Sequence, residues 1–122
     1  MNIRRQVFAM LQSTSYPVYG LFVPSSVSPP YATYHVISDV PGHTHAGHDG
    51  TAETRIQVSC YATSYQGAGE IAESVFTSIT ASTITNGVRI PRKLNELDFY
   101  EEDTKVFHIP VDFQISHVTY ST

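Results

Sequence analysis

The segment from Phe107 to Ser116 constrains the fold of this chain more than any other part of the sequence. Large apolar residues occupy every second position from Phe107 to Ile115, and the residues between them are mostly polar. Successive side chains of a strand point to opposite faces of a sheet, so this alternation predicts a strand with one face in a core. Pro110 cannot donate a hydrogen bond to a neighbouring strand, so we expect an edge strand or a bulge there.

Two further segments have the spacing of amphipathic helices. Apolar residues at three- and four-residue steps predict a short first helix from Asn2 to Ser13 and a main helix from about Tyr65 to Thr80. Ser64 is a suitable N-cap for the main helix. Gly67 and Gly69 lie in its first turns, where each costs about 1 kcal/mol relative to Ala unless it permits close packing.

Shorter patterns predict the remaining strands. Aromatic and β-branched residues favour a strand from Tyr31 to Ser38, and alternation favours another from Arg55 to Tyr61. Val18–Val23 and Val88–Pro91 are candidate short strands, and the polar stretch from Arg92 to Asp103 is expected to form loops.

A long connection is predicted between the two best of these strands. Residues 40–52 hold three glycines and a proline without apolar periodicity, which favours a flexible loop. Taken together, the order of elements predicts an α+β fold in one domain over residues 1–122. We expect a mostly antiparallel or mixed β-sheet that is covered on one face by the main helix and the short N-terminal helix.

Composition excludes several classes of protein. The formal net charge is -4 and basic residues form no large cluster, which argues against a tight grip on a nucleic-acid backbone. A single cysteine rules out an intrachain disulfide scaffold. The sequence contains no run of about 18 apolar residues, so it predicts no membrane-spanning helix. Charged residues are only 15% of the chain, so uncharged polar and aromatic side chains must cover much of its surface.

One cluster of side chains suggests metal chemistry. His43, His45, His48 and Asp49 lie within seven positions, and imidazole and carboxylate groups both bind zinc and other divalent ions. The competing interpretation is a solvated loop, because neither a helix nor a strand is predicted to fix the geometry of these ligands. We therefore expect no metal, and keep a small metal-binding domain as an alternative hypothesis.

No other group of residues indicates catalysis or a cofactor. Cys60 falls on the apolar side of a predicted strand, which favours a core thiol over a nucleophile. His35, His108 and His117 are spread over predicted strands, and the acidic residues between Glu96 and Asp103 lie in a polar stretch. The expectation is a protein that is not an enzyme.

Short motifs in the middle of the chain carry a family resemblance. These are Pro30-Tyr31, the loop 40–52, Arg55-Ile56-Gln57-Val58, Tyr61, Ser64-Tyr65 and Ala68. Their order resembles that of the tail completion, or tail terminator, proteins of siphophages, also called tail-to-head joining proteins. In that family a short N-terminal helix precedes a Pro-Tyr strand, a variable loop, an Arg-x-Gln-Val strand and a helix with an early Ala.

The resemblance implies a structural protein of the virion that caps a phage tail tube as a hexameric ring. Such a ring ends tube polymerisation and joins the tail to the head at the head–tail interface. The implied partners are other copies of the chain, the major tail tube protein and a head-completion or connector protein. DNA would pass through the ring without specific binding. A related head–tail connector or adaptor protein is a further alternative, which differs mainly in its partners.

Overall fold

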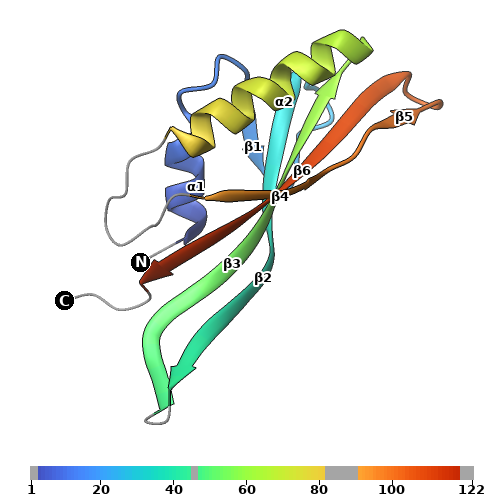
Figure 1. Ribbon diagram of the computed structural model, residues 1–122. Helices are drawn as coiled ribbons and strands as arrows, with labels where there is room; N and C mark the ends of the chain where they lie inside the picture. The colour runs from blue at the N-terminus through green and yellow to red at the C-terminus, as the bar shows by residue number, and fades with distance from the viewer. Residues whose placement is uncertain (1–2, 45–46, 82–90, 119–122) are drawn as a thin grey trace.

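Two helices cover one face of a six-stranded sheet in the computed structural model (Figure 1). The structure describes residues 3–44, 47–81 and 91–118, and within the strands it does not describe the side chains of 41–44, 47–51 and 117–118. The elements in chain order are α1 (Ile3–Leu11), β1 (Val18–Gly20), β2 (Tyr31–Thr44), β3 (Gly47–Ala62), α2 (Tyr65–Thr80), β4 (Arg92–Glu96), β5 (Phe99–Glu101) and β6 (Val106–Val118).

The strands lie in the order β1-β2-β3-β6-β4, and β5 pairs with β6 beyond the end of β4. β1 runs parallel to β2, and every other described pair is antiparallel. The predicted α+β class, with a mixed sheet covered on one face by a main and a short helix, is confirmed. The sheet leaves two edges, one formed by β1 and the free length of β2, the other by β4 and β5.

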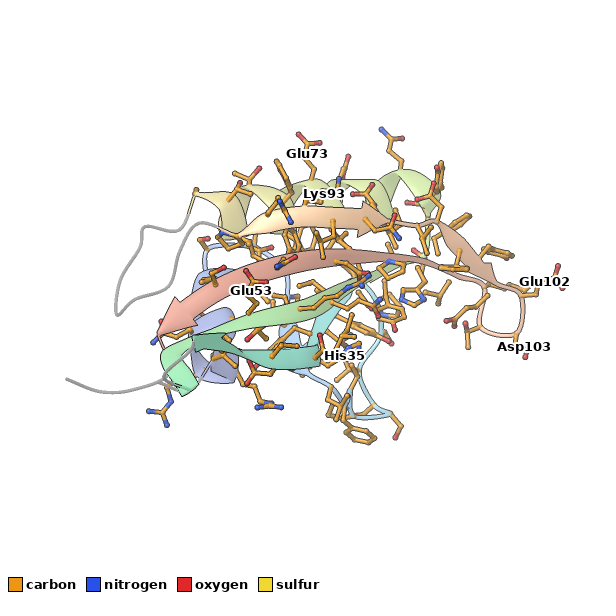
Figure 2. The ribbon with its side chains drawn as sticks, turned by 60° about the horizontal axis from the view of Figure 1, so that its bottom comes forward. His35, Glu53, Glu73, Lys93, Glu102 and Asp103 are labelled. Carbon is orange, nitrogen blue, oxygen red and sulfur yellow. The ribbon has the colours of Figure 1, made fainter. Side chains whose placement is uncertain are left out.

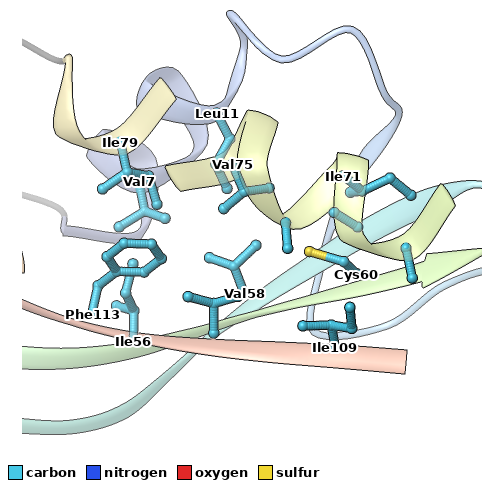
Figure 3. Close-up of a cluster of buried hydrophobic side chains, with 14 of the residues drawn as sticks. Val7, Leu11, Ile56, Val58, Cys60, Ile71, Val75, Ile79, Ile109 and Phe113 are labelled. Atoms are coloured by element: carbon cyan, nitrogen blue, oxygen red, sulfur yellow. The ribbon is translucent and has the colours of Figure 1, made fainter. Parts of the chain in front are cut away.

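The core lies between the helices and the inner face of the sheet (Figure 3). α1 contributes Val7 and Leu11, and α2 contributes a stripe that includes Ile71, Val75 and Ile79. The alternate residues predicted to point inward on β3 and β6 are buried against these helices, with Phe113 fully enclosed and only Phe107 half-buried. Both helices also begin and end within two residues of the predicted positions. Neither described helix is long and apolar enough to cross a membrane.

The predicted loop over residues 40–52 is wrong for most of its length. β2 continues to Thr44 and β3 begins at Gly47, so the two strands form one long hairpin that extends beyond the helices (Figure 1). Pro41 is compatible with β2 because β1 is short and leaves the edge of β2 opposite β3 unpaired at this position. Proline is accepted on such an edge. Glycine and proline content alone did not reveal this pairing.

The loops predicted between Arg92 and Asp103 are also partly wrong. Arg92–Glu96 and Phe99–Glu101 are the strands β4 and β5, and both pair with β6. Their residues are all exposed, so they carry no apolar alternation that local sequence could show. The strand predicted at 88–91 falls almost entirely outside the described residues, which resume at Pro91.

Neither an edge strand nor a bulge is found at Pro110. β6 has β3 on one side and β4 and β5 on the other, and the register shift beside it lies in β4, opposite Phe113 and Asp112. The carbonyl of Pro110 accepts a hydrogen bond from the amide of Leu97 at 3.1 Å. Its nitrogen therefore faces the same side, since the N and O of one strand residue point the same way. On that side β6 faces the short break between β4 and β5. The absence of an N–H group on Pro110 therefore costs no hydrogen bond between strands.

Candidate assembly surfaces

The structure places the backbone of three predicted metal ligands, His43, His48 and Asp49, on the long hairpin. His43 lies opposite His48 in the register of β2 and β3, and Asp49 follows on β3. Their side chains, and the whole of His45, lie outside the described part of the chain. Among the residues whose side chains are described, no group of three or more His, Cys, Asp or Glu could hold a metal ion. The metal hypothesis for the hairpin therefore stays a prediction.

Cys60 is a core thiol, as predicted. The residue is fully buried on β3 beneath α2 (Figure 3). Burial raises the pKa of the Cys60 thiol to about 12, and the Glu96 carboxylate adds a smaller contribution in the same direction. The thiolate that a nucleophile requires is thus absent near neutral pH.

An open groove of about 620 Å³ lies between the segment after α1 and the neighbouring side of α2. Hydroxyl groups bridge its walls, with 2.7 Å between Ser13 and Ser78 and 3.0 Å from Ser74 to Thr14. The residues that line it are all in the described part of the chain, and they include neither histidine nor cysteine nor a basic group. Two carboxylates, Glu70 and Glu73, do line it, but the groove is open to water and holds no histidine that could act as the base for one of these hydroxyls.

The outer face of the sheet, opposite the helices, carries a row of ring side chains. The aromatic row consists of Tyr19, Tyr31, Tyr61, His108 and Phe99. Tyr31, Tyr61, His108 and Phe99 are direct cross-strand partners, so they share one face. Centroid distances along the row are 6.2, 5.0, 4.3 and 6.0 Å, and the closest pair, Tyr61 and His108, stacks at 12°. The row crosses the sheet from β1 to β5.

His108 is held neutral within this row. Burial between its neighbours lowers the pKa of His108, and the Glu101 carboxylate, 3.7 Å from its Nδ1, raises it by a smaller amount. Nε2 of the same ring is buried and has no hydrogen-bond partner. With the proton of the neutral ring on Nδ1, the nitrogen that faces Glu101, protonation would add an N–H at the buried Nε2 without an acceptor, which strengthens the preference for the neutral ring.

A polar network occupies the middle of the same face. Asp112 is 7% exposed and accepts hydrogen bonds from Arg55 at 2.6 Å and Gln57 at 2.9 Å. One row further along, Gln114 donates to Glu53 at 2.7 Å and accepts from Arg92 at 3.4 Å. Glu53 and His35 both project from this face in Figure 2. The outer face is therefore ordered by its own contacts although neither helix lies on it.

Sequence reasoning missed both the aromatic row and the polar network. Alternation correctly put residues such as Gln57 and Asp112 on the outer side of their strands. Which of them become neighbours depends on strand order and register, and these follow from pairing between distant segments. His35 and His108 lie on β2 and β6 as predicted, and His117 lies on β6 with its side chain outside the description.

The acidic stretch is solvated, as predicted, although part of it is strand. Each of its carboxylates is exposed: Glu96, Asp98, Glu101, Glu102 and Asp103. Glu96 pairs with Lys93 at 2.8 Å, and Asp98 accepts a hydrogen bond from Tyr65 at 2.6 Å. Figure 2 shows Glu102 and Asp103 at the projecting tip of the β5–β6 turn.

Comparison with known proteins gives one family. The family described as tail completion protein gp17 matches residues 6–117 of the chain. The match covers α1 from its fourth residue, the whole of α2, every described strand except the last residue of β6, and all the motifs on which the resemblance rested. No curated protein matches the chain.

A solved structure shares the fold. It is a chain of the "Virion of native gene transfer agent (GTA) particle", with a TM-score of 0.74 and 14% sequence identity over 92% of this chain and 91% of that one. At that identity the likeness concerns the fold alone. It shows that this arrangement of sheet and helices occurs in a virion particle.

Proposed function

Because the chain belongs to the tail completion protein gp17 family, we propose that it forms a ring at the end of a phage tail tube. Family membership makes it a structural protein of the virion tail. In our proposal the ring is a hexamer that stops tube polymerisation and presents a surface to the head-completion or connector protein. The match over residues 6–117 is the observation that carries this proposal.

The shape of the sheet supports assembly into a ring. A ring needs a heterologous interface, in which one patch of each subunit meets a different patch of its neighbour. The described sheet has two unlike edges, one at β1 and β2 and the other at β4 and β5. Each edge leaves large apolar side chains exposed, including Phe22 on the first and Leu97 on the second.

Charge and chemistry support a passive role towards DNA. The formal net charge is -4, so a ring of six copies would carry negative charge around the path of DNA and would not hold its phosphates. Cys60 is chemically inert at neutral pH, and no histidine, cysteine or basic residue lines the groove beside α2. We therefore assign the protein a structural role without catalysis.

The test is the size and activity of the purified protein, alone and with purified tail tubes. Multi-angle light scattering should give six times the chain mass for the free protein. If the ring forms only on tubes, the mass of each tube should rise by that amount when the protein is added. Negative-stain images should show a ring at one end of each tube, and capped tubes should no longer elongate when tube protein is supplied. A protein that stays monomeric and leaves tubes free to elongate would contradict the proposal, and binding to the connector alone would favour the adaptor alternative.

A further inference from the structure

The exposed large apolar side chains of the described residues include two separate groups at opposite edges of the sheet. The first group, which we call the β1-edge patch, comes from the segment after β1, from β2, and from α1, which packs against both strands; it consists of Leu21, Phe22, Ile37 and Phe8. The second group, the β4-edge patch, consists of Phe76, Leu94 and Leu97. Three strands, β2, β3 and β6, separate β1 from β4. Patches on opposite edges can meet only on different copies of the chain.

The β1-edge patch is built around a strained turn. Leu21 has a φ of 58°, a left-handed conformation that is uncommon for a residue with a Cβ and costs on the order of 1–3 kcal/mol. Its amide donates to the carbonyl of Tyr34 at 2.8 Å, which holds the turn against β2. The turn leaves Leu21 76% and Phe22 75% exposed. Strain that projects two adjacent apolar side chains into water favours a docking role.

The sequence around this patch has an unusual charge pattern. Every Asp, Glu, Lys and Arg of the chain lies outside residues 6–38, the stretch that holds the whole β1-edge patch. Charged residues are depleted in the centres of protein interfaces and abundant on surfaces that face water. This edge therefore has the composition of a surface that is covered.

The charges at the β4-edge patch are satisfied within the subunit. The ammonium group of Lys93 lies 2.8 Å from Glu96 and 5.4 Å from the centre of the Phe76 ring. Figure 2 shows Lys93 between β4 and α2. Arg92 is likewise engaged by Gln114 at 3.4 Å. An uncharged partner can thus cover Leu94 and Leu97 without leaving a new charge unpaired.

Both edges also prevent simple extension of the sheet from copy to copy. A register shift in β2 leaves Ile37 without a partner in β3, and a shift in β4 leaves Leu94 without a partner in β6. Bulges of this kind twist an edge and block ladder pairing with another strand. The bulged residues are themselves exposed and apolar, so contact through side chains is favoured over a continuous hydrogen-bond ladder.

We propose that the β1-edge patch of one copy docks on the β4-edge patch of the next copy, by side-chain packing. This rests on the proposed ring, and it names the surfaces that close it. A second copy is the occupant that covers both patches at once, because each subunit of a ring offers one and receives the other. A different protein at either edge would leave the opposite patch in water.

Cysteine crosslinking tests this contact directly. Phe22→Cys and Leu97→Cys are made as separate variants, mixed, assembled with purified tail tubes and treated with a short bis-maleimide. The native Cys60 is buried with its pKa raised to about 12, so it adds no background. We expect crosslinked dimers in the mixture and in neither variant alone. A chain with both substitutions should give a ladder that ends at the hexamer.

A matched control places the cysteine elsewhere. Asp103→Cys lies at the projecting tip of the β5–β6 turn (Figure 2) and belongs to neither patch, so it should not crosslink to Phe22→Cys. Ile37→Cys with Leu94→Cys is a second pair that keeps the test valid if Phe22→Cys weakens docking. Electron microscopy of the same samples records whether tubes are capped.

Three outcomes would overturn the inference. Crosslinks in Phe22→Cys alone would mean that like patches meet, and a crosslink from this cysteine to the tube protein would mean a different occupant. The third is that neither mixed pair crosslinks. If tubes are still capped in that case, the ring uses other surfaces and the proposed function stands. If tubes are uncapped by the unmodified protein too, the proposed function fails separately.

Discussion

Single residues on this sheet owe their chemistry to what the strands place around them. Asp112 is an outward-facing residue by sequence, yet Arg55 and Gln57 enclose it so that it is 7% exposed. His108 and Cys60 show the same effect for titratable groups, in opposite directions, because burial disfavours the charged form of each.

Cys60 should be unreactive in the folded protein. With its pKa raised to about 12, almost none of the thiol is ionised at pH 8, and α2 blocks access to the sulfur. We expect no reaction with Ellman's reagent over an hour at pH 8, and one thiol per chain after unfolding in guanidinium. Rapid labelling of the folded protein would contradict this burial.

His108 should make the protein less stable in mild acid. Its pKa is lowered in the folded state, so the unfolded chain binds more protons below about pH 6.5, and the free energy of unfolding falls as pH drops through that range. His108→Phe keeps a ring against Tyr61 and removes the titration. Urea unfolding midpoints at pH 7.5 and 5.5 should differ less in this variant than in the parent.

The control for this measurement is His108→Gln, which also removes the titration but has no ring to stack on Tyr61. It should be less stable than His108→Phe at pH 7.5, and its two midpoints should differ as little as those of His108→Phe. If the unfolding midpoint falls by the same amount between pH 7.5 and pH 5.5 in His108→Phe and in the parent, other groups cause the acid sensitivity.

At the scale of elements, the start of α2 explains why a helix tolerates two early glycines. Ser64 caps the helix by accepting a hydrogen bond from the amide of Gly67 at 3.0 Å. A Cβ on Gly67 would lie 2.8 Å from the same Ser64 oxygen, whereas one on Gly69 would meet nothing within 4 Å. Gly67 is therefore required by the cap, and Gly69 is not.

These two glycines should respond differently to alanine. Gly69→Ala should raise the free energy of unfolding by about 0.5–1 kcal/mol, because alanine has the higher helix propensity. Gly67→Ala should give no such gain, because displacement of the Ser64 hydroxyl loses about 1 kcal/mol of capping. Chemical denaturation measures both.

A double-mutant cycle isolates the cause. In a Ser64→Ala background the cap is already absent, so Gly67→Ala should become about as favourable as Gly69→Ala. If Gly67→Ala is equally neutral with and without Ser64, the contact between the two residues does not explain the difference.

How far sequence predicts an element depends on where its structure is decided. α1, α2 and the inner-facing alternation of β3 and β6 were predictable because each buries a regular apolar stripe. β4, β5 and the far ends of β2 and β3 are strands because of the partners beside them, and their exposed or glycine-rich sequences carry no such stripe.

The same limit applies to the candidate surfaces. The family motifs in the middle of the chain predicted a tail completion protein, and the family match confirms that part. The aromatic row and the two edge patches could not be predicted, since Tyr61 meets His108, and Leu94 becomes an edge residue, only through the order of the strands.

For the whole molecule, stability depends on a single core shared by both helices and the sheet. Phe113 is fully buried on β6 and lies near Val7, Ile56 and Ile79 in Figure 3. Phe113→Ala should lower the free energy of unfolding by about 3–5 kcal/mol. That is a large share of the roughly 5–15 kcal/mol of a typical domain.

Loss of this ring should be seen by every probe at once. Far-UV circular dichroism and tyrosine fluorescence should report one coincident, weakened transition in Phe113→Ala. Separate transitions for helix and sheet would show that the two layers are less coupled than their shared core implies.

The uncharged stretch from residue 6 to residue 38 has a consequence for how the particles respond to their surroundings. If rings are closed by the two apolar patches as proposed, added salt has little to screen, so such rings should persist at high ionic strength. Cooling weakens apolar association, so the same rings should loosen in the cold. Particles whose tail ring is closed by such contacts should tolerate a change in salt concentration better than a fall in temperature.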